Sequence, residues 1–285
     1  MSNYHNVFYK VADGLTLYAR DYAGPTADAP VLLCMHGLTR NSRDFARIAP
    51  TLALTHRVIV VEQRGRGRSE YDDQVERYVP ATYIGDMFEL LGQLGISHCA
   101  TLGTSMGGLM AMGMNAINPT LFTHIVLNDI GPIVAQDGLN RIKQYVGSAS
   151  EFPDWDAAVA YARAMNGSAF PNNTDAQWRT FAEQICSERD GKIVLDYDTR
   201  LSQPMKADDG AAVPPDLWPL FDSMADKPVM LIRGMLTDLL DLDCVAEMQR
   251  RHPGMVRVDV AGVGHAPMLD ESGVLDQIVA FINRR

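Results

Sequence analysis

The sequence predicts an α/β fold, in which a mostly parallel, doubly wound sheet is interrupted by one long helical insertion. Short continuous apolar runs, such as residues 31–35, 58–61 and 125–130, indicate strands buried on both faces. Segments with helical apolar spacing separate these runs, and this alternation implies a parallel sheet with helices on both faces. The alternation stops after Gly131-Pro132 and resumes only near residue 228.

Each element has a local signal. Asp13-Gly14 between two apolar runs predicts a β-hairpin turn, and Gly95 is a suitable residue to follow a helix end. In chain order we expect a hairpin at 7–11 and 15–20, strand 31–35, helix 42–55, strand 58–61, helix 82–95, strand 99–102, a helix from 108, strand 125–130, strand 228–232, helix 242–251, strand 256–260 and a helix from about 273.

The break in the alternation divides the chain. Residues 1–131 and 227–285 are expected to form the α/β core, and residues 132–226 are expected to form a helical cap inserted into it. The inserted segment is rich in aromatic residues, such as Trp155, Phe170 and Trp178, but contains no convincing buried strand. We therefore expect it to be mainly helical and to cover the active site.

Composition and charge exclude several classes of partner. The chain is 47% hydrophobic and 21% charged, which is typical of a globular protein, and its net charge is −10. That charge argues against nucleic acid or an anionic membrane surface as a partner. The first residues resemble no signal peptide, and no run is long and apolar enough to cross a bilayer, so a cytoplasmic protein is expected. No feature of the sequence specifies an oligomeric state.

The cysteines and histidines predict neither disulfides nor a metal site. The four cysteines are widely spaced, without a C-x-x-C pair, and Cys34 and Cys99 fall in apolar strand runs that suggest core packing. The seven histidines have no H-x-x-x-H or H-E-x-x-H spacing. We expect no metal and no cofactor.

The segment Gly103-Thr104-Ser105-Met106-Gly107 has the pattern of a nucleophile elbow. It lies between a short apolar run, predicted to be a strand, and a longer run of small apolar residues, predicted to be a helix. Glycines allow the tight turn that leaves a serine hydroxyl exposed at the end of the sheet. Ser105 is therefore the candidate nucleophile.

A serine nucleophile needs a base, and the base needs an acid to orient it. His265 lies in a glycine-rich segment after the last predicted strand, and it is the candidate base. Asp238 follows strand 228–232 and gives the order Ser, Asp, His, so we favour it as the acid. Asp129, at the end of strand 125–130, is the alternative.

Two backbone N–H groups are candidates for an oxyanion hole. One belongs to Met106, immediately after the candidate nucleophile, and the other to Leu38, after His36-Gly37 at the end of a predicted strand. Their side chains matter little because the donors are backbone groups.

Taken together, these motifs resemble the α/β-hydrolase superfamily. The resemblance rests on His36-Gly37, the loop at residues 63–69, the elbow, Asp238 and Gly264-His265, in that order. It is nearest to the capped branch that contains esterases, enol-lactonases and carbon–carbon hydrolases. It implies an α/β-hydrolase fold that covers the chain apart from the cap. Glu62 stands where an Asp usually precedes the Arg-Gly-x-Gly loop. Because that loop has a structural role, this difference does not affect the implied activity.

The resemblance implies hydrolysis of a small molecule without a cofactor. A serine nucleophile excludes the relatives that use aspartate, and it indicates cleavage of a largely apolar carboxylic ester or lactone through an acyl-enzyme. One alternative is a carbon–carbon bond hydrolase acting on a vinylogous diketone, whose anionic end needs an arginine. The candidates for that arginine are Arg40, Arg163, Arg179 and Arg200. A slow-turnover ligand receptor is the second alternative.

Overall fold

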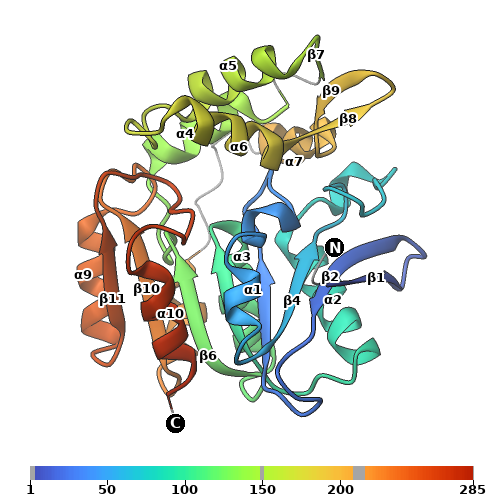
Figure 1. The fold of residues 1–285 in the computed structure, drawn as a ribbon. Coiled ribbons are helices and arrows are strands. Elements are labelled where there is room, and N and C mark those ends of the chain that lie inside the picture. Colours follow the sequence, from blue (N-terminus) through green and yellow to red (C-terminus); the bar gives the residue numbers. More distant parts are fainter. Residues whose placement is uncertain (1–3, 148–150, 208–215, 285) are drawn as a thin grey trace.

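The computed structural model describes residues 4–147, 151–207 and 216–284, and it confirms the predicted α/β fold. Eight strands form one sheet in the order β1-β2-β4-β3-β5-β6-β10-β11 (Figure 1). Their bounds are β1 His5–Lys10, β2 Thr16–Tyr22, β3 Val31–Met35, β4 Arg57–Glu62, β5 Cys99–Thr104, β6 Phe122–Asn128, β10 Val229–Gly234 and β11 Val256–Val260. All neighbours from β4 to β11 are parallel, and β2 is antiparallel to both β1 and β4.

Helices cover both faces of the sheet, as continuous apolar strands require. One core contains buried residues of α2 (Pro80–Gln93), α3 (Met106–Ile117) and α9 (Leu242–Arg251). The other contains α1 (Ala49–Leu52) and α10 (Val274–Ile282). The helix expected over 42–55 is interrupted: a 3₁₀ turn, η1 (Ser42–Phe45), precedes α1, which begins anew with Pro50 in its first turn.

The inserted segment packs over the edge of the sheet where the parallel strands end (Figure 1). Its helices are α4 (Gln136–Tyr145), α5 (Trp155–Asn166), α6 (Asp175–Ile185) and α7 (Ser202–Ala207), with a 3₁₀ turn η3 (Thr199–Leu201) before α7. A further helix, α8 (Trp218–Asp222), also falls within 132–226 but packs against α3 of the core. Another 3₁₀ turn, η2 (Val75–Arg77), precedes α2.

The insertion also contains short strands that the sequence did not lead us to expect. Strands β7 (Glu151–Phe152), β8 (Cys186–Arg189) and β9 (Lys192–Leu195) form a separate antiparallel sheet in the order β7-β9-β8. The hairpin turn between β8 and β9 is Asp190-Gly191, and both residues have positive φ, 51° and 74°. Asp-Gly favours that geometry, so the signal was present in the sequence. These strands are short and half-exposed rather than continuously apolar.

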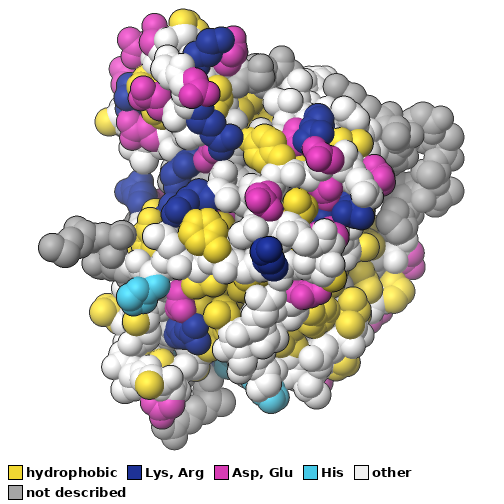
Figure 2. Space-filling model, turned by 90° about the vertical axis from the view of Figure 1, so that its right-hand side faces the viewer, with side chains coloured by type: hydrophobic (Ala, Val, Ile, Leu, Met, Phe, Trp, Pro, Cys, Tyr) yellow, Lys and Arg dark blue, Asp and Glu magenta, His cyan; other side chains and the backbone are white. Residues whose placement is uncertain are grey.

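Ion pairs join the insertion to the core. Arg43 in η1 pairs with Asp196, just after β9, at 2.7 Å, and Arg141 in α4 pairs with Asp238, in the loop after β10, at 2.5 Å. On the face in Figure 2, basic and acidic side chains are interspersed over the upper part of the molecule. No helix within the described ranges is long and apolar enough to span a membrane.

Candidate active site

Ser105 occupies a sharp turn between β5 and α3. Its backbone has φ 52° and ψ −116°, outside the conformations that a serine ordinarily adopts. The flanking glycines are needed because a Cβ on Gly103 would lie 2.4 Å from the Gly107 carbonyl carbon, and one on Gly107 would lie 2.2 Å from the Met35 oxygen. The structure thus has the local geometry that the Gly-x-Ser-x-Gly pattern predicts.

His265 connects Ser105 to a buried carboxylate. Its Nε2 lies 2.8 Å from the Ser105 Oγ, and its Nδ1 lies 2.8 Å from Asp129 Oδ2. The Asp129 side chain is fully buried, whereas His265 is 9% exposed. Since a carboxylate can only accept, Nδ1–H donates to Asp129 and Nε2 is left to accept from the serine hydroxyl. A serine, a histidine and an aspartate therefore form one hydrogen-bonded chain.

The expectation that Asp238 would orient His265 is wrong in this structure. The Asp238 carboxylate instead accepts two hydrogen bonds from Arg141, at 2.5 and 2.8 Å, and its side chain is 36% exposed. The hydrogen bond from Arg141 lowers the pKa of Asp238, against the opposing effect of partial burial. The alternative considered from the sequence, Asp129, occupies the position against His265.

The register of strands β6 and β10 explains why Asp129, and not Asp238, contacts His265. Strands β6 and β10 are parallel neighbours, and Asp129, the first residue after β6, donates its N–H to the Ile232 oxygen at 2.8 Å. Its Oδ1 accepts from the Gly234 N–H at 2.9 Å, which leaves Oδ2 for His265. Asp238 lies four residues beyond the end of β10, where the loop has turned toward α4. Asp129 thus lies beside His265 at the end of its strand, whereas Asp238 lies farther along its loop, beside α4.

The turn after β3 presents the Leu38 backbone to the same pocket. Buried His36 accepts from the Gln63 N–H through Nε2, at 3.1 Å, so its Nδ1–H donates to the Gly37 oxygen at 2.7 Å. Because Gly37 C=O and Leu38 N–H belong to one trans peptide, this bond fixes the direction of both groups. No acceptor in the described part of the chain pairs with the N–H of Leu38 or of Met106.

Arg66 contacts both residues that carry these N–H groups, a role that we did not expect from the sequence. Its Nε donates to the Leu38 oxygen at 2.9 Å, and its Nη2 lies 3.8 Å from the Met106 sulfur. The side chain is fully buried, it stacks on the Tyr83 ring at 4.6 Å, and it forms no ion pair with a described carboxylate. A buried guanidinium without a neutralising carboxylate contributes positive potential behind the pocket.

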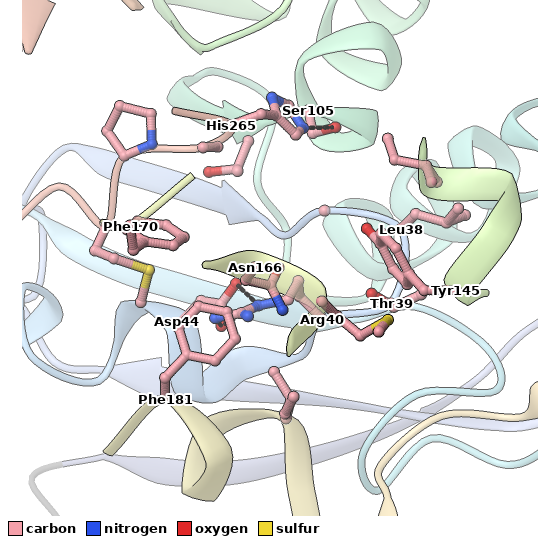
Figure 3. Close-up of a pocket in the computed structure, with 18 of the residues that line it drawn as sticks. Leu38, Thr39, Arg40, Asp44, Ser105, Tyr145, Asn166, Phe170, Phe181 and His265 are labelled. Atoms are coloured by element: carbon pink, nitrogen blue, oxygen red, sulfur yellow. Dashed lines mark hydrogen bonds and ion pairs between the residues drawn. The ribbon is translucent and has the colours of Figure 1, made fainter. Parts of the chain in front are cut away.

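The pocket in front of Ser105 has an apolar side and a polar end. It encloses about 100 Å³ and reaches from Ser105 and His265 to side chains of the insertion. Figure 3 shows Arg40 and Asp44 across the pocket from Ser105, with Phe181 beside them. Arg40 donates to both oxygens of Asp44 at 2.9 Å and lies over the Phe181 ring. The apolar side chains that the insertion contributes to the pocket are Ile142, Met165, Phe170, Phe181, Ile185 and Leu195.

Among the residues that the structure describes, no group of three or more His, Cys, Asp or Glu side chains is placed to hold a metal ion. Each of the four cysteines is buried as a free thiol, and burial raises the pKa of all four.

The environment of His36 makes a pH-dependent contribution to stability. Burial lowers its pKa to about 3, and the nearby Arg66 charge acts in the same direction. In the unfolded chain the same imidazole titrates near its ordinary value of about 6.5. Between these two values the unfolded state binds a proton that the native state does not, so this contribution is complete above about pH 6.5 and falls as the pH is lowered.

We therefore expect His36→Asn to flatten the acid side of the stability profile. The difference in unfolding free energy between the parent protein and the variant should shrink by about 2 kcal/mol between pH 7 and pH 5, at about 1.36 kcal/mol per pH unit below 6.5. Urea unfolding at both pH values measures this difference, and the carboxylates common to both proteins cancel. A difference independent of pH would show that His36 is not held neutral.

Comparison with known proteins gives consistent matches. Residues 31–277 match the family model described as the alpha/beta hydrolase family. The chain is 35% identical over 261 residues to a 3-hydroxybutyrate-oligomer hydrolase of Cupriavidus necator, covering 89% of this chain and 88% of the relative. It is 27% identical to a 2-(acetamidomethylene)succinate hydrolase of Mesorhizobium japonicum, covering 83% and 81%. A crystal structure of an alpha/beta hydrolase from Novosphingobium aromaticivorans superposes with a TM-score of 0.94 at 38% identity, covering 100% of both chains.

Proposed function

Since this chain belongs to the alpha/beta hydrolase family, we propose that it is a serine hydrolase that cleaves a carboxylic ester, or a lactone, of a small and largely apolar substrate. The observation that supports this most directly is the hydrogen-bonded chain from Ser105 through His265 to Asp129. A hydroxyl at 2.8 Å from an imidazole that a buried carboxylate orients is the arrangement that activates serine as a nucleophile.

In the proposed mechanism, Ser105 Oγ attacks the ester carbonyl while His265 Nε2 takes its proton. The imidazolium is stabilised by Asp129, and the N–H groups of Leu38 and Met106 bind the oxyanion. His265 then protonates the departing alcohol, leaving an acyl-enzyme on Ser105. A water molecule, deprotonated by the same imidazole, attacks the acyl-enzyme and releases the acid.

The arginines support ester cleavage over the carbon–carbon alternative. That alternative needs an arginine for the anionic end of its substrate, but all four candidates have a carboxylate partner. Arg40 pairs with Asp44, Arg163 with Asp175, Arg179 with Glu183 and Arg200 with Asp198. Units of 3-hydroxybutyrate are joined by ester bonds, so the name of the relative from Cupriavidus necator fits the same chemistry.

A fluorophosphonate probe tests the nucleophile. We expect stoichiometric labelling at Ser105, located by peptide mass spectrometry, because an activated serine next to oxyanion donors attacks phosphorus readily. Ser105→Ala and heat-unfolded protein are the controls, and both should remain unlabelled. Labelling that persists in Ser105→Ala, or that never occurs in the native protein, would contradict the proposal.

A substrate panel distinguishes the reaction types. It contains p-nitrophenyl esters of increasing acyl length, lactones and a vinylogous diketone. We expect steady turnover of short esters. Turnover of the diketone alone would favour the carbon–carbon alternative, and a burst without steady turnover would favour a ligand receptor.

A further inference from the structure

A second cavity adjoins the pocket at Ser105. It encloses about 270 Å³ between helix α6 and residues 261–271, at the junction of the insertion and the core. Phe170, Phe181 and Met268 line both cavities and so form a shared wall. We call this second cavity the distal crevice. Its lining is Arg47, Phe170, Asn172, Asn173, Gln177, Thr180, Phe181, Gln184, Ala261, Gly262, Val263, Met268, Asp270 and Glu271.

Neutral hydrogen-bonding side chains dominate the insertion side of the distal crevice. Amide groups can donate to an ester carbonyl and can accept from a hydroxyl, without requiring a charged ligand. The pocket at Ser105, in contrast, is mainly apolar around the candidate nucleophile. The neutral polar residues that line the distal crevice are Asn172, Asn173, Gln177, Thr180 and Gln184.

The core side of the distal crevice is acidic. Arg47 is paired with Asp270 at 2.8 Å, so Glu271 remains as an additional carboxylate. Glu271 Oε1 accepts from the Met268 N–H at 2.7 Å, and its Oε2 is buried. Two carboxylates against one guanidinium disfavour a ligand carboxylate, whereas a neutral hydroxyl can donate to the carboxylate and amide oxygens of this lining.

We propose that the distal crevice binds the hydroxyl-terminated end of a linear oligoester whose ester bond is cleaved at Ser105. This inference rests on the proposed ester hydrolysis. In a linear chain of hydroxy acids, the fragment that retains the free hydroxyl is always the acyl fragment. The distal crevice therefore holds the acyl chain that is transferred to Ser105. For the acyl chain to pass between the two cavities, the unbranched and flexible side chain of Met268 must rotate away from the shared wall.

The test compares acyl chains of increasing length with a constant leaving group. The substrates are p-nitrophenyl esters of one, two and three four-carbon 3-hydroxyacyl units, with p-nitrophenyl butyrate as the short reference. We expect kcat/KM to rise about tenfold from one unit to two or three units, an increment of the size that a few new polar contacts supply. Methylation of the terminal hydroxyl, or its replacement by a carboxylate, should remove most of this gain.

Two variants of helix α6 locate the effect. Thr180→Trp fills the distal crevice from an exposed position and should abolish the gain for two and three units relative to p-nitrophenyl butyrate measured with the same variant. Ala176→Trp adds the same side chain one helical turn away, at an exposed position outside both cavities, and should retain the full gain.

The outcomes separate this inference from the proposed function. If p-nitrophenyl butyrate is hydrolysed but chain length has no effect, the inference fails and the ester hydrolase proposal stands. The inference also fails if Thr180→Trp and Ala176→Trp respond alike, or if Thr180→Trp slows the short reference ester as much as the oligoesters. No hydrolysis of any of these esters would overturn both.

Discussion

Replacing Asp129 by asparagine is expected to lower kcat for a p-nitrophenyl ester by about four orders of magnitude with little effect on the fold, as expected for the acid that sets the histidine tautomer. An asparagine can present its NH₂ group to His265 Nδ1. That contact would place the imidazole proton on Nε2, where it blocks acceptance from Ser105. Steady-state kinetics, with circular dichroism to verify folding, measure the effect.

Asp238→Asn is the matched control, because it makes the same chemical change in the carboxylate first expected to fill this role. It removes the negative charge from a partly exposed ion pair with Arg141. Such pairs contribute little to stability, so turnover should remain close to that of the parent protein. If Asp238→Asn were the variant that lost activity while Asp129→Asn kept it, the assignment of Asp129 would be overturned.

The second large effect is expected from Arg66→Met, which keeps much of the side-chain volume but removes the guanidinium. The variant loses the hydrogen bond to the Leu38 oxygen and the contact with the Met106 sulfur, so both proposed oxyanion donors lose a common support. We expect kcat to fall by about 10²–10³, the cost of losing one oxyanion donor, with KM much less affected.

Arg68→Met is the control for this variant, since Arg68 lies in the same loop but is exposed and stacks on Tyr18 away from the pocket. It should leave kcat unchanged. Arg66→Lys keeps the positive charge but not the planar fork, and it should recover part of the loss. A folded Arg66→Met protein with unchanged kcat would show that this arginine only fills space.

Much of the sheet could be predicted from the sequence because its strands are buried on both faces. Such strands are continuously apolar, so they can be located in the sequence without knowledge of their tertiary contacts. Ser105 and His265 could be proposed for a related reason, since the glycines around them report local backbone geometry. The prediction and the structure agree most closely at these buried strands and tight turns, where the local sequence alone determines the backbone conformation.

The choice between Asp129 and Asp238 depended on tertiary structure. Both residues follow neighbouring parallel strands, and only the course of the loop after β10 separates them. Along this course the loop contacts α4, which lies more than 90 residues earlier in the chain. The Gly138 N–H donates to the Asp238 backbone oxygen, and Arg141 forms an ion pair with the Asp238 carboxylate. The small sheet of the insertion was missed for another reason. Its strands are too short and too exposed to form the apolar runs used to identify strands.

The position of Asp129 before the insertion has a consequence for how this protein can diverge. With Ser105 and Asp129 both upstream of the insertion, the loop after β10 carries none of the proposed reacting groups. Instead, Asp238 in this loop forms an ion pair with Arg141 of α4, which attaches the insertion to the core. Mutations of this ion pair can change how the insertion rests on the core without replacing Ser105, His265 or Asp129. Mutations that alter substrate preference can therefore accumulate in this loop separately from mutations that alter the proposed reacting groups.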